Sequence, residues 1–134
     1  MRDVTHGTDV RWTLEEANAA LPEVSQLVGV IVENSSLLRD LRVPATLRFE
    51  GRAWLLTAGS LAKEQLTDRA AERIENAASA LRALGVTMKD CAVGLVDFES
   101  FREGRRIELC WMLGEENIGY RHEADAGFSC RRPL

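Results

Sequence analysis

The sequence lacks several features that mark particular classes of protein. Its three cysteines, Cys91, Cys110 and Cys130, cannot all pair within one chain and none stands in a CxxC spacing, which favours reduced thiols over a zinc knuckle. There is no excess of positive charge: the net charge is −4 and the pI about 5.3, which gives no electrostatic reason to expect nucleic-acid binding. The longest nearly uncharged apolar run, Leu27–Val32, is far too short to cross a bilayer, and the first ten residues lack the apolar stretch of a secretory signal. These absences predict a cytoplasmic protein with neither a nucleic-acid nor a membrane partner.

Common catalytic motifs are missing as well. The chain contains no GxSxG, Walker loop, dinucleotide fingerprint or HExxH, so nucleophilic and nucleotide-driven chemistry have no support in the sequence. What is present is ordinary for a globular domain, with 134 residues, of which 46% are hydrophobic and 28% charged. We expect a single domain over residues 1–134, with a helical part at about 13–85 and a β meander with an ordered C-terminal tail at about 92–134.

Two long helices are expected in the first part of the chain. Thr13 followed by Glu16 is typical of a capping box, in which each side chain bonds a free backbone N–H at the start of a helix. Gly85 fits a left-handed cap that ends the second helix, which runs from about residue 60 to residue 84. Apolar residues recur at three-four spacing along both segments, at Leu14, Ala17, Leu21, Val24, Val28, Ile31 and Leu38 and at Leu66, Ala70, Ile74, Ala77, Leu81 and Leu84. This pattern predicts an antiparallel helical hairpin whose apolar faces could also join two copies in a homodimer, while residues 43–59 fit either a β-hairpin or a helix extension.

From residue 92 onward the period changes from helical to alternating. The segments "VGLVDF", "RIELCWML" and "IGYRH" fit three strands separated by short turn signals, which predicts an antiparallel meander. The fold class is therefore α+β, a long antiparallel helical hairpin packed on a small three-stranded antiparallel sheet. A turn at "FREG" would pair Phe98 with Ile107, and a four-residue "GEEN" loop would pair Leu109 with His122. In this register His122 faces the helices.

The same register predicts a row of acids on the opposite face of the sheet. Asp97, Glu108 and Glu123 would lie side by side, and three carboxylates at one level repel one another unless positive charge lies among them. Arg106 and Arg121 could be the counter-charges of a solvated face, or a hard metal ion could bind to the carboxylate oxygens.

The segment "HEAD" contains the sharpest candidate for a site. His122, Glu123 and Asp125, together with Asp97, offer an imidazole and carboxylates that suit a divalent metal ion such as iron, manganese or zinc. His122 and Asp125 are also the candidates for catalytic acid/base residues, whereas the plainer alternative makes His122 a packed, hydrogen-bonded structural residue. His6 could add a ligand only if the N-terminal arm folds back.

The chain ends with two arginines that allow two interpretations. Arg131 and Arg132 could bind a phosphate or carboxylate, because guanidinium groups grip such anions bidentately. They could instead pair with acids of the chain itself. Gly127 predicts a turn that returns Phe128 to the core, in which case the tail is ordered.

Three stretches resemble a known family. They are "TLEEANAALPEV", "LRALGVTMKDCAVGLVDFES" and "GRRIELCWMLGEENIGYRHEADAGFSCRRPL", and the family is the bacterial one catalogued as domain of unknown function 2203. The resemblance implies a small protein of long helices capped by a short sheet and carries no activity. The chain differs from the family at Cys130, where a glycine is more usual, and at Arg121, where relatives more often carry an aromatic residue. The resemblance implies that a shared site would be sought at Asp97, Trp111, Glu115, Tyr120, His122, Glu123, Asp125, Gly127 and Phe128.

Two classes of function follow from the sequence. The first is a binding or assembly module with a polar site near the C-terminal tail. The alternative is a small metal-dependent or acid/base enzyme that uses His122 with Asp97, Glu123 and Asp125. The two classes of function differ in where the side chains of the candidate residues should converge, so their positions in the structure discriminate between the classes.

Overall fold

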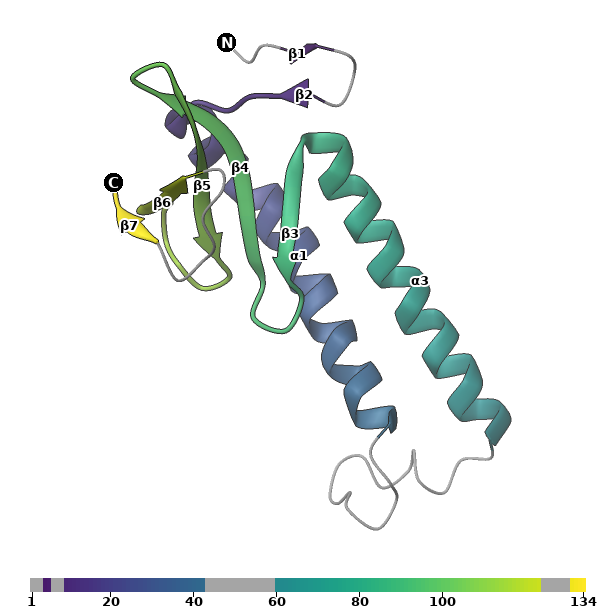
Figure 1. The fold of residues 1–134 in the computed structure, drawn as a ribbon. Coiled ribbons are helices and arrows are strands. Elements are labelled where there is room, and N and C mark those ends of the chain that lie inside the picture. Colours follow the sequence, from purple (N-terminus) through teal and green to yellow (C-terminus); the bar gives the residue numbers. More distant parts are fainter. Residues whose placement is uncertain (1–3, 6–8, 43–59, 124–130) are drawn as a thin grey trace.

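The computed structural model describes residues 4–5, 9–42, 60–123 and 131–134. Two long helices lie beside a five-stranded antiparallel sheet, and a separate two-stranded piece precedes them (Figure 1). Along the chain the elements are β1 (Val4–Thr5), β2 (Asp9–Val10), α1 (Leu14–Arg42), α3 (Ser60–Leu84), β3 (Val86–Asp90), β4 (Leu95–Arg102), β5 (Arg105–Met112), β6 (Tyr120–Glu123) and β7 (Arg132–Pro133).

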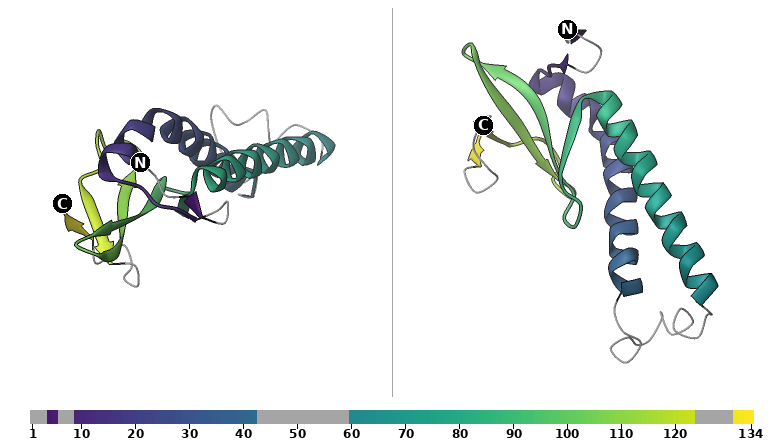
Figure 2. Two further views of the ribbon diagram at one scale, coloured as in Figure 1. Left: turned by 90° about the horizontal axis from the view of Figure 1, so that it is seen from above. Right: turned by 45° about the vertical axis from the view of Figure 1, so that its right-hand side comes forward.

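The predicted helical hairpin is confirmed, and local chemistry explains its limits. α1 begins where predicted because the Glu16 N–H donates to Thr13 Oγ1 at 3.0 Å and the Thr13 N–H donates to Glu16 Oε1 at 3.1 Å. α3 ends at Leu84 because Gly85 takes a φ of 81°, which glycine adopts without steric cost. α1 and α3 run antiparallel and side by side, and their ends near residues 42 and 60 extend beyond the sheet (Figures 1 and 2). The β-hairpin or helix extension considered for residues 43–59 lies outside the described residues.

The sheet has five strands, so the prediction of three was incomplete. Its order is β3-β4-β5-β6-β7, with every neighbouring pair antiparallel. β3 follows α3 after a single glycine, in the stretch between the predicted helical part, which ends at about residue 85, and the predicted meander, which starts at about residue 92. β7 was missed because a two-residue segment that includes Pro133 lacks the alternation and the N–H donors by which strands are recognised.

The pairing of β4 with β5 differs from the predicted register by two residues. Phe98 pairs with Leu109 rather than with Ile107, because the turn consists only of Glu103 and Gly104. Both residues have positive φ angles, 54° and 78°, as a two-residue type I′ hairpin requires. A shift of two preserves the faces, so Phe98 and Leu109 still point toward the helices.

The pairing of β5 with β6 differs by one residue, which exchanges the two faces of β6. Glu108 pairs with His122, whereas the prediction paired Leu109 with His122. His122 therefore lies on the side of the sheet away from the helices, and Arg121 and Glu123 lie on the side of the helices. The predicted acidic row keeps Asp97 and Glu108 but gains His122 in place of Glu123.

The cause of this shift is the connection between the two strands. It spans residues 113–119 and is fixed by tertiary contacts rather than by a short turn. Its Ile118 is buried in the core and donates its N–H to Asn18 Oδ1 of α1 at 2.8 Å, and Trp111 Nε1 donates to the Glu115 carbonyl at 3.0 Å.

The core lies between the first half of α1, the end of α3 and one face of the sheet. We call this face the helix-side face; it includes Phe98 and Leu109, and Trp12 meets the Phe98 ring edge-on at a centroid distance of 5.2 Å. The buried cluster is Trp12, Ala17, Leu21, Val24, Val28, Ile31, Ala77, Leu81, Val86, Val96, Phe98, Ile107, Leu109, Trp111 and Ile118. The opposite side, which includes Asp97, Glu108 and His122, is called the polar face.

Candidate functional site

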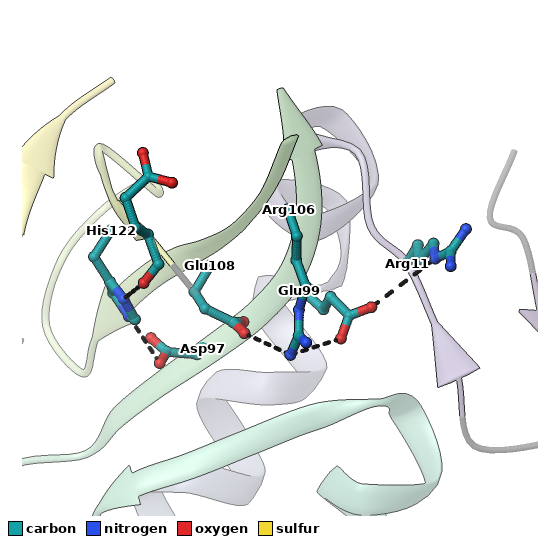
Figure 3. Close-up of polar contacts among 7 residues, drawn as sticks. Arg11, Asp97, Glu99, Arg106, Glu108 and His122 are labelled. Atoms are coloured by element: carbon teal, nitrogen blue, oxygen red, sulfur yellow. Dashed lines mark hydrogen bonds and ion pairs between the residues drawn. The ribbon is translucent and has the colours of Figure 1, made fainter. Parts of the chain in front are cut away.

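The polar face gathers ionisable side chains from three strands. Asp97 and Glu99 come from β4, Glu108 and Cys110 from β5, and His122 from β6 (Figure 3). Asp97 and His122 are only 2% and 5% exposed, and Cys110 is fully buried. A buried charge is costly unless it is paired and hydrogen-bonded, so the partners of these groups decide what the face can do.

Both ring nitrogens of His122 have an oxygen partner. Its Nδ1 lies 2.8 Å from the backbone carbonyl of Glu123, which can only accept, and its Nε2 lies 2.9 Å from Asp97 Oδ2 (Figure 3). Burial acts to lower the pKa of His122, but the Glu123 carbonyl, the charge and hydrogen bond of Asp97, and the charge of Glu108 outweigh it and raise the pKa above its ordinary value. The two side chains therefore form a buried hydrogen-bonded pair, here called the His122–Asp97 pair.

This arrangement bears directly on the proposed metal or acid/base role of His122. Both ring nitrogens already have a hydrogen-bond partner, and a metal ion would have to displace one of these partners to bind the ring. Among the residues described here, no group of three or more His, Cys, Asp or Glu side chains is placed to hold a metal ion. Glu123 lies on the other face from Asp97, and Asp125 and His6 lie outside the described residues, so a ligand set that includes Asp125 stays a prediction.

The remaining two acids of the polar face, Glu99 and Glu108, both lie close to Arg106. Its Nη2 lies 3.1 Å from Glu99 Oε2 and 3.3 Å from Glu108 Oε1 (Figure 3). Arg106 is therefore a counter-charge of this face, as one of the two interpretations of the acidic row expected. Burial, and after it the charge of Asp97, raises the pKa of Glu108. The same two causes raise the pKa of the Cys110 thiol to about 11, so it stays protonated at neutral pH.

Arg131 holds the C-terminal strand against the sheet. Its Nη2 lies 2.6 Å from Glu115 Oε1, and its guanidinium stacks 3.9 Å above the Tyr120 ring. Glu115 also accepts the Met112 N–H at 2.7 Å. Of its two predicted roles, Arg131 thus takes the pairing with an acid of its own chain.

A pocket that the sequence did not reveal lies where α1 begins, lined by the helix-side residues Ile107 and Leu109 and, from the other side of β4, by Phe101. It has a volume of about 520 Å³ and a mostly apolar surface, and we call it the apolar pocket. Three exposed large apolar side chains, Leu14, Phe101 and Leu134, gather around it. Its lining is Arg11, Trp12, Thr13, Leu14, Ser100, Phe101, Arg102, Ile107, Leu109 and Leu134.

A smaller hollow of about 200 Å³ lies next to it, here called the arginine hollow. Its lining is Arg102, Glu103, Arg105, Ile107, Arg121, Glu123 and Arg132. Arg105 lies 3.7 Å from Glu123, whereas Arg102, Arg121 and Arg132 make no ion pair within the described ranges. The Nε atom of Arg121 is buried and has no hydrogen-bond acceptor among these residues.

Fold and site together define a small α+β protein, a helical hairpin packed on an antiparallel sheet, with ion pairs on its polar face and an arginine-lined hollow beside an apolar pocket. Its family follows from the sequence. The model of the family described as "Uncharacterized conserved protein (DUF2203)" matches residues 11–134, so the chain belongs to that family. Neither a curated protein nor a solved structure matches the chain. In the part of the chain that the structure describes, no helix is long and apolar enough to cross a membrane.

Proposed function

We propose that the protein is a non-catalytic binding module whose apolar pocket receives the hydrophobic part of a ligand. The observation that carries this proposal is the convergence of Leu14, Phe101 and Leu134, three exposed large apolar side chains from three distant parts of the sequence, on one pocket. Exposed apolar side chains scattered singly need no explanation, but a cluster around a concavity is typical of a binding site.

The walls of the pocket are held in place by the core. Ile107 and Leu109 are buried members of the main hydrophobic cluster. Trp12 donates its backbone N–H to the Glu99 carbonyl at 2.8 Å and accepts a hydrogen bond from Ser100 Oγ at its own carbonyl. A site of this kind is formed before the ligand arrives, and its volume falls within the range of roughly 300–1,000 Å³ usual for small-molecule sites.

A neutral single-chain alcohol tests the proposal without involving charge. We expect 1-decanol, kept below its solubility limit, to bind the wild-type protein at one saturable site in isothermal titration calorimetry. Phe101→Ser should weaken this binding about tenfold, because burial of an aromatic side chain against a ligand contributes roughly 1.5–3 kcal/mol.

The matched control is Val93→Ser. Val93 is 45% exposed and Phe101 44% exposed, but Val93 does not line the pocket. Its substitution should leave the affinity for decanol unchanged within about twofold. Equal weakening by both substitutions, or no saturable binding at all, would contradict the proposal.

Other expectations from the sequence stay proposals alongside this one. They are the single domain, a cytoplasmic location, the absence of a nucleic-acid partner and a homodimer formed through the helical faces. The apolar faces of α1 and α3 are covered by packing within the chain, so the homodimer rests on the sequence pattern alone, and light scattering across micromolar concentrations tests it.

A further inference from the structure

We infer that the ligand of the apolar pocket is an anionic amphiphile, whose chain occupies the apolar pocket and whose headgroup binds in the arginine hollow. The inference rests on the proposed function for the chain-binding half of the site and adds the chemical class of the ligand. The ligand meant here is a free single-chain molecule that carries a phosphate or a similar oxyanion.

The two cavities are parts of one surface. Arg102 and Ile107 line both of them. The C-terminal strand also contributes to both, because Arg132 lines the hollow and Leu134 lines the apolar pocket. A molecule with an apolar chain and a compact charged end can therefore reach both cavities at once.

Among the residues that the structure describes, the acids of the hollow do not balance its arginines. Four arginines and two glutamates line it, and Glu123 is already near Arg105. The sheet register makes Arg102 the direct cross-strand partner of Arg105, and Arg121 that of Arg132. Like charges placed directly opposite one another on a sheet are destabilising, so an anion in the hollow would relieve a repulsion that the fold otherwise keeps.

Arg121 supplies an independent sign of a missing acceptor. Its Nε–H is withdrawn from water and has no acceptor among the described residues. A buried donor left without a partner costs free energy, and native proteins rarely keep one without a reason. An oxyanion beside Arg121 would accept this hydrogen bond, and guanidinium groups bind phosphate oxygens in a bidentate manner.

Paired ligands that differ only at the headgroup test the inference. Monomeric decyl phosphate, kept below its critical micelle concentration, should bind the wild-type protein about tenfold or more tightly than 1-decanol in calorimetry. The difference should shrink as salt is added, because screening weakens contacts between exposed charges.

Substitutions then assign the headgroup preference to the hollow. The double variant Arg121→Gln/Arg132→Gln should lose the preference for decyl phosphate while still binding decanol. The control is Arg39→Gln/Arg69→Gln, which removes the same formal charge from exposed positions on α1 and α3. It should keep the preference, because these positions do not line the site.

The outcomes separate the inference from the proposed function. Equal affinity for decanol and decyl phosphate in the wild-type protein, or a preference that both double variants lose alike, would overturn the inference and leave the apolar site standing. No binding of either ligand would overturn both. Binding to phosphatidylglycerol vesicles without binding of monomeric decyl phosphate would overturn the inference in favour of a membrane surface.

Discussion

On the polar face of the sheet, His122 and Arg106 each lie within 3.3 Å of a carboxylate, whereas on the helix-side face Arg102, Arg121 and Arg132 have no such partner in the described chain. The two faces differ in how their charged side chains are paired: on the polar face Asp97 contacts His122 through Oδ2, although its buried Oδ1 has no hydrogen-bond partner among the described residues. A buried hydrogen-bonded pair limits the chemistry open to its members, while an unsatisfied basic cluster beside a pocket leaves donors for a ligand. A site role for His122 stays a prediction, and the arginines that the strand register brings together on the helix-side face are a second candidate.

The largest expected effect on stability comes from removing the carboxylate of the His122–Asp97 pair on the polar face. Asp97→Ala leaves the buried ring of His122 without its carboxylate partner, so the free energy of unfolding should fall by about 3–5 kcal/mol in urea titrations. Glu103→Gln removes a carboxylate from the arginine hollow. It should change the free energy of unfolding by no more than about 0.5 kcal/mol, because Glu103 is exposed and unpaired within the described ranges. Similar costs for the two substitutions would show that the faces do not differ in this way.

The pH dependence of the free energy of unfolding is a second test of the pairing on the polar face. Because the pKa of His122 is raised in the folded state, its stabilising contribution is complete below its ordinary pKa of about 6.5 and is lost as the pH rises through the higher folded value. Glu108, whose pKa is also raised, acts in the same direction. The free energy of unfolding should therefore decline as the pH is raised above about 6.5.

Asp97→Asn is the reference for this measurement, because it keeps the shape and an acceptor but removes the charge that holds the His122 proton. Its unfolding free energy should decline less steeply over the same interval. A slope identical to that of the wild-type protein would assign the pH dependence to other groups.

The smallest expected effect concerns the helix-side face. In the absence of ligand, Arg121→Gln/Arg132→Gln should raise the free energy of unfolding by about 0.5 kcal/mol, because it removes one pair of like charges facing each other across β6 and β7. The measurement is urea unfolding at low salt, where surface repulsion is least screened. Arg39→Gln/Arg69→Gln should produce no such gain, and a clear loss of stability in Arg121→Gln/Arg132→Gln would mean that these arginines hold the fold together.

Local chemistry explains how far the sequence predicted the molecule. The capping box at Thr13 and Glu16 and the cap at Gly85 depend only on residues close in sequence. The start of α1 and the end of α3 could therefore be predicted from the sequence. The side of the sheet on which Phe98 lies was also predicted correctly, because an error of two residues in the strand register leaves each side chain on the same face.

The faces of β6 were wrong because their register depends on a contact that is distant in sequence. Ile118 is anchored by Asn18, a hundred residues away, and no turn signal in "GEEN" contains that information. The error in the register of β6 also changed the candidate site. His122 rather than Glu123 lies in the row of the polar face, and Arg121 lies on the helix-side face, where it pairs with Arg132. That Arg132 binds an anion stays a prediction, now with a hollow beside it.

The last strand of the sheet has a consequence for how the protein behaves at high concentration. An open sheet edge is a template on which the strand of another molecule can add, and repeated addition leads to fibres. Here the edge at β7 is only two residues long, and one of them, Pro133, has no N–H to offer a further strand. At this edge of the sheet, beside the apolar pocket, a neighbouring molecule thus finds only a short stretch of backbone to which a strand could add.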